Sequence, residues 1–206
     1  MSIHSRATGP AATAADAVDA PDPRLLRRTL GEFATGVTVV TVGGGTPHAM
    51  TANSFTSVSL DPPLVLVCIG HQAVMHRRLS TGYFGVSVLA AHQEEIARYF
   101  ADLSRPLGAA QFEGVDCDIG PQAGVPLIGG ALARFECQVW NVHDAGDHTI
   151  FLGRVLSMDR PGAGRPEALL FYQGRFHRLG PDAVPAPDAV PAPDAVPGPD
   201  AGEVTS

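Results

Sequence analysis

Short runs of β-branched and apolar residues, separated by glycine and proline turns, dominate the pattern of this 206-residue chain. The first run, residues 37–42, leads into the glycines at 43–45, and a return strand begins at about His48, which predicts a hairpin. Several short strands without alternating helices predict a mainly β fold, an antiparallel Greek-key barrel with peripheral helices. The further strands are expected at 64–69, 83–89, 131–142, 148–158, 168–172 and 175–179.

A helical pattern precedes the first strand. Asp22 is typical of an N-cap and Pro23 of a first helical position. Apolar residues four and seven positions after Leu26 would then share one face of a helix that ends near 35–36. Shorter helices are expected at 71–80 and 93–102.

The sequence divides into one domain, residues 22–180, and two flanking segments. Residues 1–21 lack periodicity and predict a disordered lead-in. Residues 181–206 repeat PDAVPA, PDAVPA and PDAVPG, which predicts an extended acidic tail, either a dispensable spacer or a tether for a partner. Residues 103–130 are rich in Gly and Pro and predict a long connection without regular structure, which is more often functional or partner-facing than idle.

Charge and cysteine content exclude several classes of protein. The net charge is -7, but the segment from Pro181 holds four Asp, one Glu and no basic residue, so the folded part is nearly neutral. It also lacks the stripe of basic residues that would indicate nucleic-acid binding. All basic residues are Arg, which excludes a Schiff-base or P-loop lysine. Three widely spaced cysteines and the absence of a long apolar run predict a cytoplasmic protein without a disulfide framework or membrane span.

Hydroxyl and amide groups gather between two apolar strands, at residues 51–59. Polar groups lose free energy when they are desolvated without a partner, so a polar ligand or turn hydrogen bonds must meet them. A flavin is one such ligand, because its ring carries a polar edge and a flat apolar face. The histidines offer no helical spacing and no clear third ligand for zinc, so no metal is expected.

The segment TANSFTSVSLDPP at 51–63, followed by an apolar strand, resembles the flavin reductases of two-component monooxygenases, which are FMN-binding split-barrel proteins. A second segment, GDHTIFLGRV at 146–155, resembles the part of these reductases that lies beside the nicotinamide. The resemblance runs from about Leu25 to Leu179. It implies a set of cofactor-contacting residues, which are Thr51, Ala52, Asn53, Ser54, Ser57, Val58, Ser59, Cys68, Ile69, Gly70, His71, Asp147 and His148.

The resemblance also implies roles within this set. His148 would lie at the reaction centre and orient the nicotinamide, while Asp147 fixes its tautomer. The strand end at 68–70 would lead to the flavin phosphate. Relatives place Ser or Thr shortly after this strand, whereas this chain has His71 and Gln72, so these residues or the following helix would meet the phosphate.

The expected activity is therefore reduction of FMN or FAD by NADH or NADPH, in a homodimer that passes reduced flavin to a separate oxygenase. No dinucleotide-binding glycine motif occurs, so the nicotinamide nucleotide would bind transiently across the flavin. Two alternatives stay open. One is a flavin- or haem-binding split-barrel protein without turnover, and the other is an oxidase that retains FMN.

Overall fold

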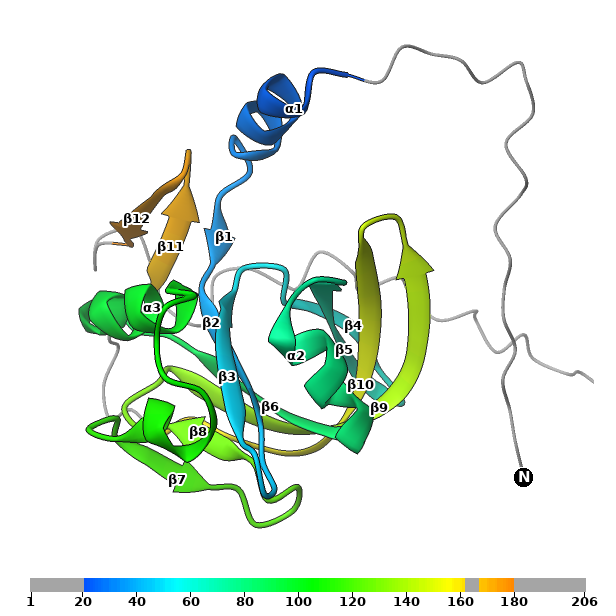
Figure 1. The fold of residues 1–206 in the computed structure, drawn as a ribbon, viewed down its shortest axis with the longest axis vertical. Coiled ribbons are helices and arrows are strands. Elements are labelled where there is room, and N and C mark those ends of the chain that lie inside the picture. The colour runs from blue at the N-terminus through cyan, green and yellow to red at the C-terminus, as the bar shows by residue number, and fades with distance from the viewer. Residues whose placement is uncertain (1–20, 162–166, 180–206) are drawn as a thin grey trace, which may run out of the picture.

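Antiparallel pairing joins every pair of neighbouring strands, as the short apolar runs predicted (Figure 1). The computed structural model describes residues 21–161 and 167–179. The predicted disordered segments, 1–21 and 181–206, lie outside the described residues except for Pro21. One large sheet has the strand order β3-β2-β6-β9-β10-β5-β4, and two small sheets have the orders β1-β11-β12 and β7-β8.

The predicted strands are present close to their expected positions, and β1, β4, β7 and β8 are additional strands. The large sheet contains β2 (Thr38–Val42), β3 (His48–Ala52), β4 (Thr56–Leu60), β5 (Pro63–Gly70), β6 (Tyr83–Val88), β9 (Ala133–Ala145) and β10 (His148–Asp159). The small sheets contain β1 (Thr35–Gly36), β7 (Cys117–Ile119), β8 (Pro126–Ile128), β11 (Leu169–Tyr172) and β12 (Arg175–Arg178). The helices are α1 (Pro23–Leu30), α2 (Val74–Arg78) and α3 (Glu94–Ala101), with 3₁₀ turns η1 (Leu79–Thr81), η2 (Ala91–Gln93) and η3 (Gly108–Phe112). None of the helices in the described ranges has the length and apolar character that a membrane crossing requires.

The large sheet curls around one apolar core. Val40 from β2 and Ile69 from β5 are both fully buried in this core, although their strands lie in opposite halves of the sheet. The helix α2 contributes Met75, which is also fully buried, and α2 contacts both β3 and β5 (Figure 1). The expected barrel is not closed, because within the described residues β3 and β4 do not pair with each other and remain the two edges of the sheet.

A second core lies on the outer face of the sheet, beneath α3. Val37 and Val39 pack there with Ala97 and Phe100 of α3, because alternate residues of a strand point to opposite faces. The remaining outer face along β5 and β10 is different. Its residues are only half-buried, although every second position between them is buried in the inner core. We call these residues the open face: Leu64, Leu66, Cys68, Ile150 and Leu152.

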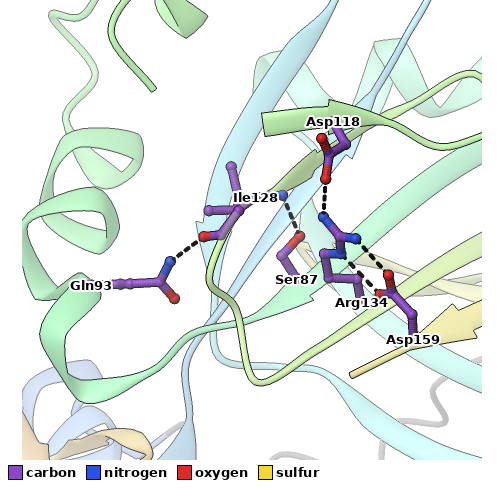
Figure 2. Close-up of polar contacts among 7 residues, drawn as sticks. Ser87, Gln93, Asp118, Ile128, Arg134 and Asp159 are labelled. Carbon is purple, nitrogen blue, oxygen red and sulfur yellow. Dashed lines mark hydrogen bonds and ion pairs between the residues drawn. The ribbon is translucent and has the colours of Figure 1, made fainter. Parts of the chain in front are cut away.

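The connection at 103–130 contains more structure than its composition predicted, since η3, β7 and β8 lie within it. Polar contacts fix it to the body of the protein, and Figure 2 shows three of them. Ser87 Oγ accepts a hydrogen bond from the Ile128 amide at 3.0 Å, and Gln93 Nε2 donates to the Gly129 carbonyl at 2.7 Å. Arg134, which is buried, donates from Nη1 to Asp118 at 2.6 Å. These anchors come from distant parts of the sequence, so local composition gave no sign of them.

The same connection covers the outer edge of β3. Gln111 is fully buried, and its Oε1 accepts a hydrogen bond from the Ala49 amide at 2.9 Å. Arg105 Nη2 donates to the carbonyl of the same residue. Both backbone groups of Ala49 that point away from the sheet are therefore bonded to side chains.

The first helix begins as predicted and ends earlier. The Asp22 side chain accepts a hydrogen bond from the Arg24 amide, with Pro23 at the first position, but α1 ends at Leu30 instead of near 35–36. Residues 35–36 instead form β1, which pairs with β11. The predicted apolar face remains exposed, since Leu26 and Leu30 are 44% and 66% accessible.

Candidate functional site

The two segments that carry the family resemblance meet at the end of the large sheet. In the pairing of β10 with β5, His148 lies opposite Gly70. A Cβ atom built on Gly70 would lie 3.6 Å from His148 Nε2, so the imidazole packs over this glycine. The structure therefore brings together the start of β10 and the end of β5, as predicted for a shared site.

Asp147 orients the imidazole of His148. Its Oδ1 lies 2.6 Å from His148 Nδ1, and this hydrogen bond lowers the pKa of the exposed Asp147 carboxyl. A carboxylate is an acceptor, so Nδ1 carries a proton, and Nε2 is the ring nitrogen that is left free of Asp147. The predicted role of Asp147 in fixing the ring requires this contact, and the role itself stays a prediction.

The turn before His148 is tighter than expected. The sequence predicted a turn over 143–147, whereas β9 continues to Ala145 and leaves Gly146 and Asp147 as a two-residue turn. Gly146 has a φ of 72°, which glycine adopts without strain and which suits a two-residue hairpin. The longer strand also places Asp144 beside His71, with Asp144 Oδ1 3.3 Å from His71 Nε2.

His71 lies against the same turn. Its amide donates to the Asp147 carbonyl at 3.0 Å, which extends the pairing of β5 with β10 by one residue. This placement holds His71 within the group formed by Gly70, Asp147 and His148. Gln72, the next residue, is exposed, and among the described residues it forms no hydrogen bond to this turn.

The predicted residues at 51–54 lie at the end of β3 and just after it, and their polar groups already bond within the chain. Thr51 Oγ1 donates to the Ala97 carbonyl at 2.7 Å, and Asn53 Nδ2 donates to Thr35 Oγ1 at 3.2 Å. Ser54 Oγ donates to the Cys68 carbonyl and accepts from the Cys68 amide, both at 3.0 Å. The hydroxyl of Thr51 therefore joins β3 to α3, and the hydroxyl of Ser54 joins the segment after β3 to β5. Neither hydroxyl proton is available as a donor to a ligand.

An apolar pocket of about 190 Å³ adjoins this segment. Thr51, Ala52 and Asn53 line one side of it. Phe171 and Phe176, from the β11-β12 hairpin, line the other. The sequence analysis missed these two phenylalanines as site residues, although their hairpin was predicted, because nothing local showed that the hairpin returns to residues 51–53.

The remaining predicted site residues differ in the solvent exposure of their side chains. Ser57 and Val58 are exposed on the edge strand β4, and Ser59 is half-buried. The register of β4 against β5 shifts between Ser57 and Ser59, which leaves Val58 in an irregular position. The Ile69 side chain is fully buried in the core, so only its backbone is able to meet a cofactor. Cys68 lies on the open face, and burial raises the pKa of its thiol.

Within the described part of the chain, no group of three or more His, Cys, Asp or Glu side chains has the arrangement of a metal site. Met50 and Phe55 pack against the inner core, whereas Trp140 is 53% exposed on β9.

Known proteins share both the sequence and the fold. Residues 30–180 match the family described as flavin reductase like domain. An NADH-dependent FAD reductase of Streptomyces globisporus is 56% identical over 170 residues, which covers 82% of this chain and 92% of that protein. The reductase subunit HsaB of a flavin-dependent monooxygenase, from Rhodococcus jostii (strain RHA1), is 39% identical over 185 residues, which covers 88% of this chain and 90% of that protein.

A solved structure extends this likeness to three dimensions. The NADH:FAD oxidoreductase SgcE6 of Streptomyces globisporus C-1027, in complex with NAD and FAD fragments, is 54% identical and has a TM-score of 0.74. The match covers 80% of this chain and 98% of that protein.

Proposed function

This chain belongs to the flavin reductase like domain family, and we propose that it reduces FMN or FAD with NADH and supplies the reduced flavin to a separate monooxygenase. The observation that carries the proposal is the meeting of Asp147 and His148 with Gly70 and His71 at the end of the sheet. This arrangement joins the two segments that the family resemblance assigned to flavin and nicotinamide. The identity of 56% to an NADH-dependent FAD reductase supports the same activity.

The residues present fit a flavin. The pocket beside residues 51–53 is apolar and offers a surface for the flat face or the methylated edge of a ring system. The exposed polar side chain of Asn53 belongs to the lining of this pocket. A bound flavin supplies the redox chemistry, since its ring accepts a hydride from the nicotinamide. The backbone and side chains of the site supply position and electrostatics.

His148 acts by position. Its Nδ1 donates to Asp147, so Nε2 is the ring nitrogen that is left to meet a ligand. Hydride transfer needs no strong general base, and the imidazole contributes an oriented surface and a hydrogen-bond acceptor for the carboxamide of a nicotinamide. Asp147 keeps this orientation and does not need to exchange a proton during turnover.

The proposal is tested by NADH oxidation with purified protein and FMN, FAD or riboflavin added separately. We expect saturable NADH oxidation that depends on added flavin and that also proceeds when a flavin-dependent monooxygenase is absent. Lack of oxidation with any of the three flavins, using either NADH or NADPH, would overturn the reductase and favour a flavin-binding protein without turnover.

Replacing His148 with alanine should raise the KM for NADH about tenfold and leave the KM for flavin nearly unchanged, a loss of about 1.4 kcal/mol in nicotinamide binding. The matched control is His143→Ala, because His143 is exposed on the same hairpin and pairs with Ile150, two residues along β10 from His148. Steady-state kinetics with one substrate varied at a time separate the two KM values. A rise in the flavin KM alone would contradict the assigned role.

We further propose that the curled sheet is the split barrel of this family and that a second copy of the chain covers the open face. A sheet face that meets water normally carries polar residues, whereas this face presents leucine and isoleucine side chains from both β5 and β10. A contiguous apolar surface that a single chain leaves only half-buried marks an interaction site. A cytoplasmic location is proposed on the separate ground that Cys68, Cys117 and Cys137 are all free.

Replacing Leu66 with glutamate should convert a dimer into a monomer of 21.4 kDa, because a charge would then be buried at the centre of the open face. Light scattering after gel filtration measures the mass directly. Leu103→Glu is the control, since Leu103 is 94% exposed on the connection and lies away from the open face. A wild-type protein that is already monomeric would refute the proposed dimer.

A further inference from the structure

A hydrogen bond joins α2 to the strand that carries His148. His76 of α2 places its Nε2 2.8 Å from Thr149 Oγ1. Thr149 directly follows His148 and is only 6% exposed, so water does not compete freely for its hydroxyl. The imidazole of His76 also meets the ring of Phe151 edge-on, with 5.7 Å between the ring centres.

The same imidazole contacts the end of β5. The rings of His76 and His71 lie edge to face with centres 5.2 Å apart. The amide of His71 in turn donates to the Asp147 carbonyl. His76 therefore touches both chain segments that meet at the site, one through Thr149 and the other through His71.

His76 acts from the opposite side of the sheet to His148. Successive side chains of a strand point to opposite faces, so His148 and Thr149 project in opposite directions. Thr149 lies opposite Ile69, whose side chain is in the inner core, and His148 lies opposite Gly70. A ligand over His148 would not touch His76, so any effect of His76 on that ligand must pass through Thr149 and the backbone of β10 or through His71.

Packing of α2 does not depend on His76. Met75 and Leu79 already anchor this region, since they are 0% and 1% exposed. The hydrogen bond to Thr149 therefore adds orientation to a helix that apolar burial holds in place.

We propose that His76 is a positioning residue, which through Thr149 and His71 fixes the turn that presents His148 to the nicotinamide. This inference rests on the proposed reductase function, and it names a residue that touches neither flavin nor nicotinamide. Its consequence is that the imidazole orientation at His148 depends on a helix on the other face of the sheet.

The test is a double-mutant cycle of His76→Phe and Thr149→Val. Phenylalanine keeps an aromatic ring against Phe151 and His71 but removes the hydrogen bond, and valine keeps the shape of threonine without the hydroxyl. Each single variant should raise the KM for NADH roughly fivefold, with the KM for flavin unchanged. The double variant should resemble either single variant, because both remove the same interaction.

A second readout does not require activity. Amide hydrogen exchange of His71, measured by NMR on protein without flavin, reports the bond from this amide to the Asp147 carbonyl. Exchange should be faster in His76→Phe and in Thr149→Val than in the wild type. Thr149→Ser retains the hydroxyl and should restore both the KM for NADH and slow exchange.

The outcomes separate the two proposals. If wild-type protein reduces flavin but the variants keep the wild-type KM and exchange rate, His76 has no positioning role and the reductase function stands. Additive KM effects in the double variant would likewise overturn the coupling through this hydrogen bond. If wild-type protein fails to oxidise NADH, the proposed function falls, and unchanged exchange at His71 would then reject the ordering of the turn as well.

Discussion

Replacing Gly43 with alanine should destabilise the protein by about 3 kcal/mol, because the added methyl group meets backbone that has no room to move. An ideal Cβ on Gly43 would lie 2.0 Å from the Gly124 carbonyl oxygen and 3.3 Å from Val125 Cα. The glycine ends the first hairpin strand, and the opposing loop packs directly on it.

The opposing loop is held too firmly to yield. Glu136 is 1% exposed, and its Oε2 accepts hydrogen bonds from the amides of Gln122 and Ala123 at 2.9 and 2.6 Å. The Gly124 amide donates to the Gly120 carbonyl at 2.9 Å. A shift of this loop would break bonds to a buried carboxylate, which is why a single methyl group is expected to be so costly.

Gly45→Ala is the matched control, since a Cβ on Gly45 meets nothing within 4 Å and its φ is not positive. Urea unfolding followed by circular dichroism should show a lower midpoint for Gly43→Ala. The free energy of unfolding of Gly45→Ala should lie within about 0.5 kcal/mol of that of the wild type. Equal midpoints for the two variants would show that the loop adjusts to the methyl group.

Acid should weaken the protein between about pH 6.5 and pH 4 through His48. This histidine is 4% exposed, and burial lowers its pKa from 6.5 to about 4, with further lowering by the positive charges of Arg105 and Arg78. The unfolded chain therefore binds a proton at a higher pH than the folded chain does. Stability from the neutral imidazole is complete above pH 6.5 and falls as the pH decreases, by about 1.4 kcal/mol per pH unit and about 3 kcal/mol in total.

His48→Leu isolates this contribution, because the leucine variant has no group to titrate at this position. The difference in unfolding free energy between wild type and variant should change with pH across this window and become constant above it. Titration of the carboxyl groups affects the unfolding free energy of both proteins equally, so their contribution cancels in the difference. A difference that is independent of pH from 7 to 4 would refute the lowered pKa.

Local pattern predicted most of the strands because their signals are themselves local. The run at residues 37–42 and its glycine turn gave the hairpin of β2 and β3, and Asp22 with Pro23 gave the start of α1. The end of α1 was wrong by about a turn, since residues 35–36 pair with β11, a strand far along the chain. The predicted barrel closure was not observed, and local pattern could not decide it, because closure requires pairing between strands at distant edges of the sheet.

In the candidate site, too, the sequence indicated some features and left others to the fold. The resemblance placed Gly70 and His148 in one site, and the register of β10 with β5 makes them direct neighbours. The residues alone left open whether the hydroxyls of Thr51 and Ser54 meet a ligand or form hydrogen bonds within the chain, and the resemblance favoured a flavin. In the structure both bond to backbone carbonyls of other elements. A hydroxyl that serves a strand and one that serves a ligand look alike in a sequence, and only the fold distinguishes them.

The side chains that cover Ala49 have a consequence for how the protein meets other chains. An exposed edge strand invites edge-to-edge pairing, which leads to aggregation when the meeting is uncontrolled. Gln111 and Arg105 occupy the amide and the carbonyl with which an incoming strand would begin to pair along β3. A strand from another chain would therefore meet hydrogen-bonding groups of β3 that are already occupied. The long glycine- and proline-rich connection in this way protects the edge of the sheet against β-aggregation.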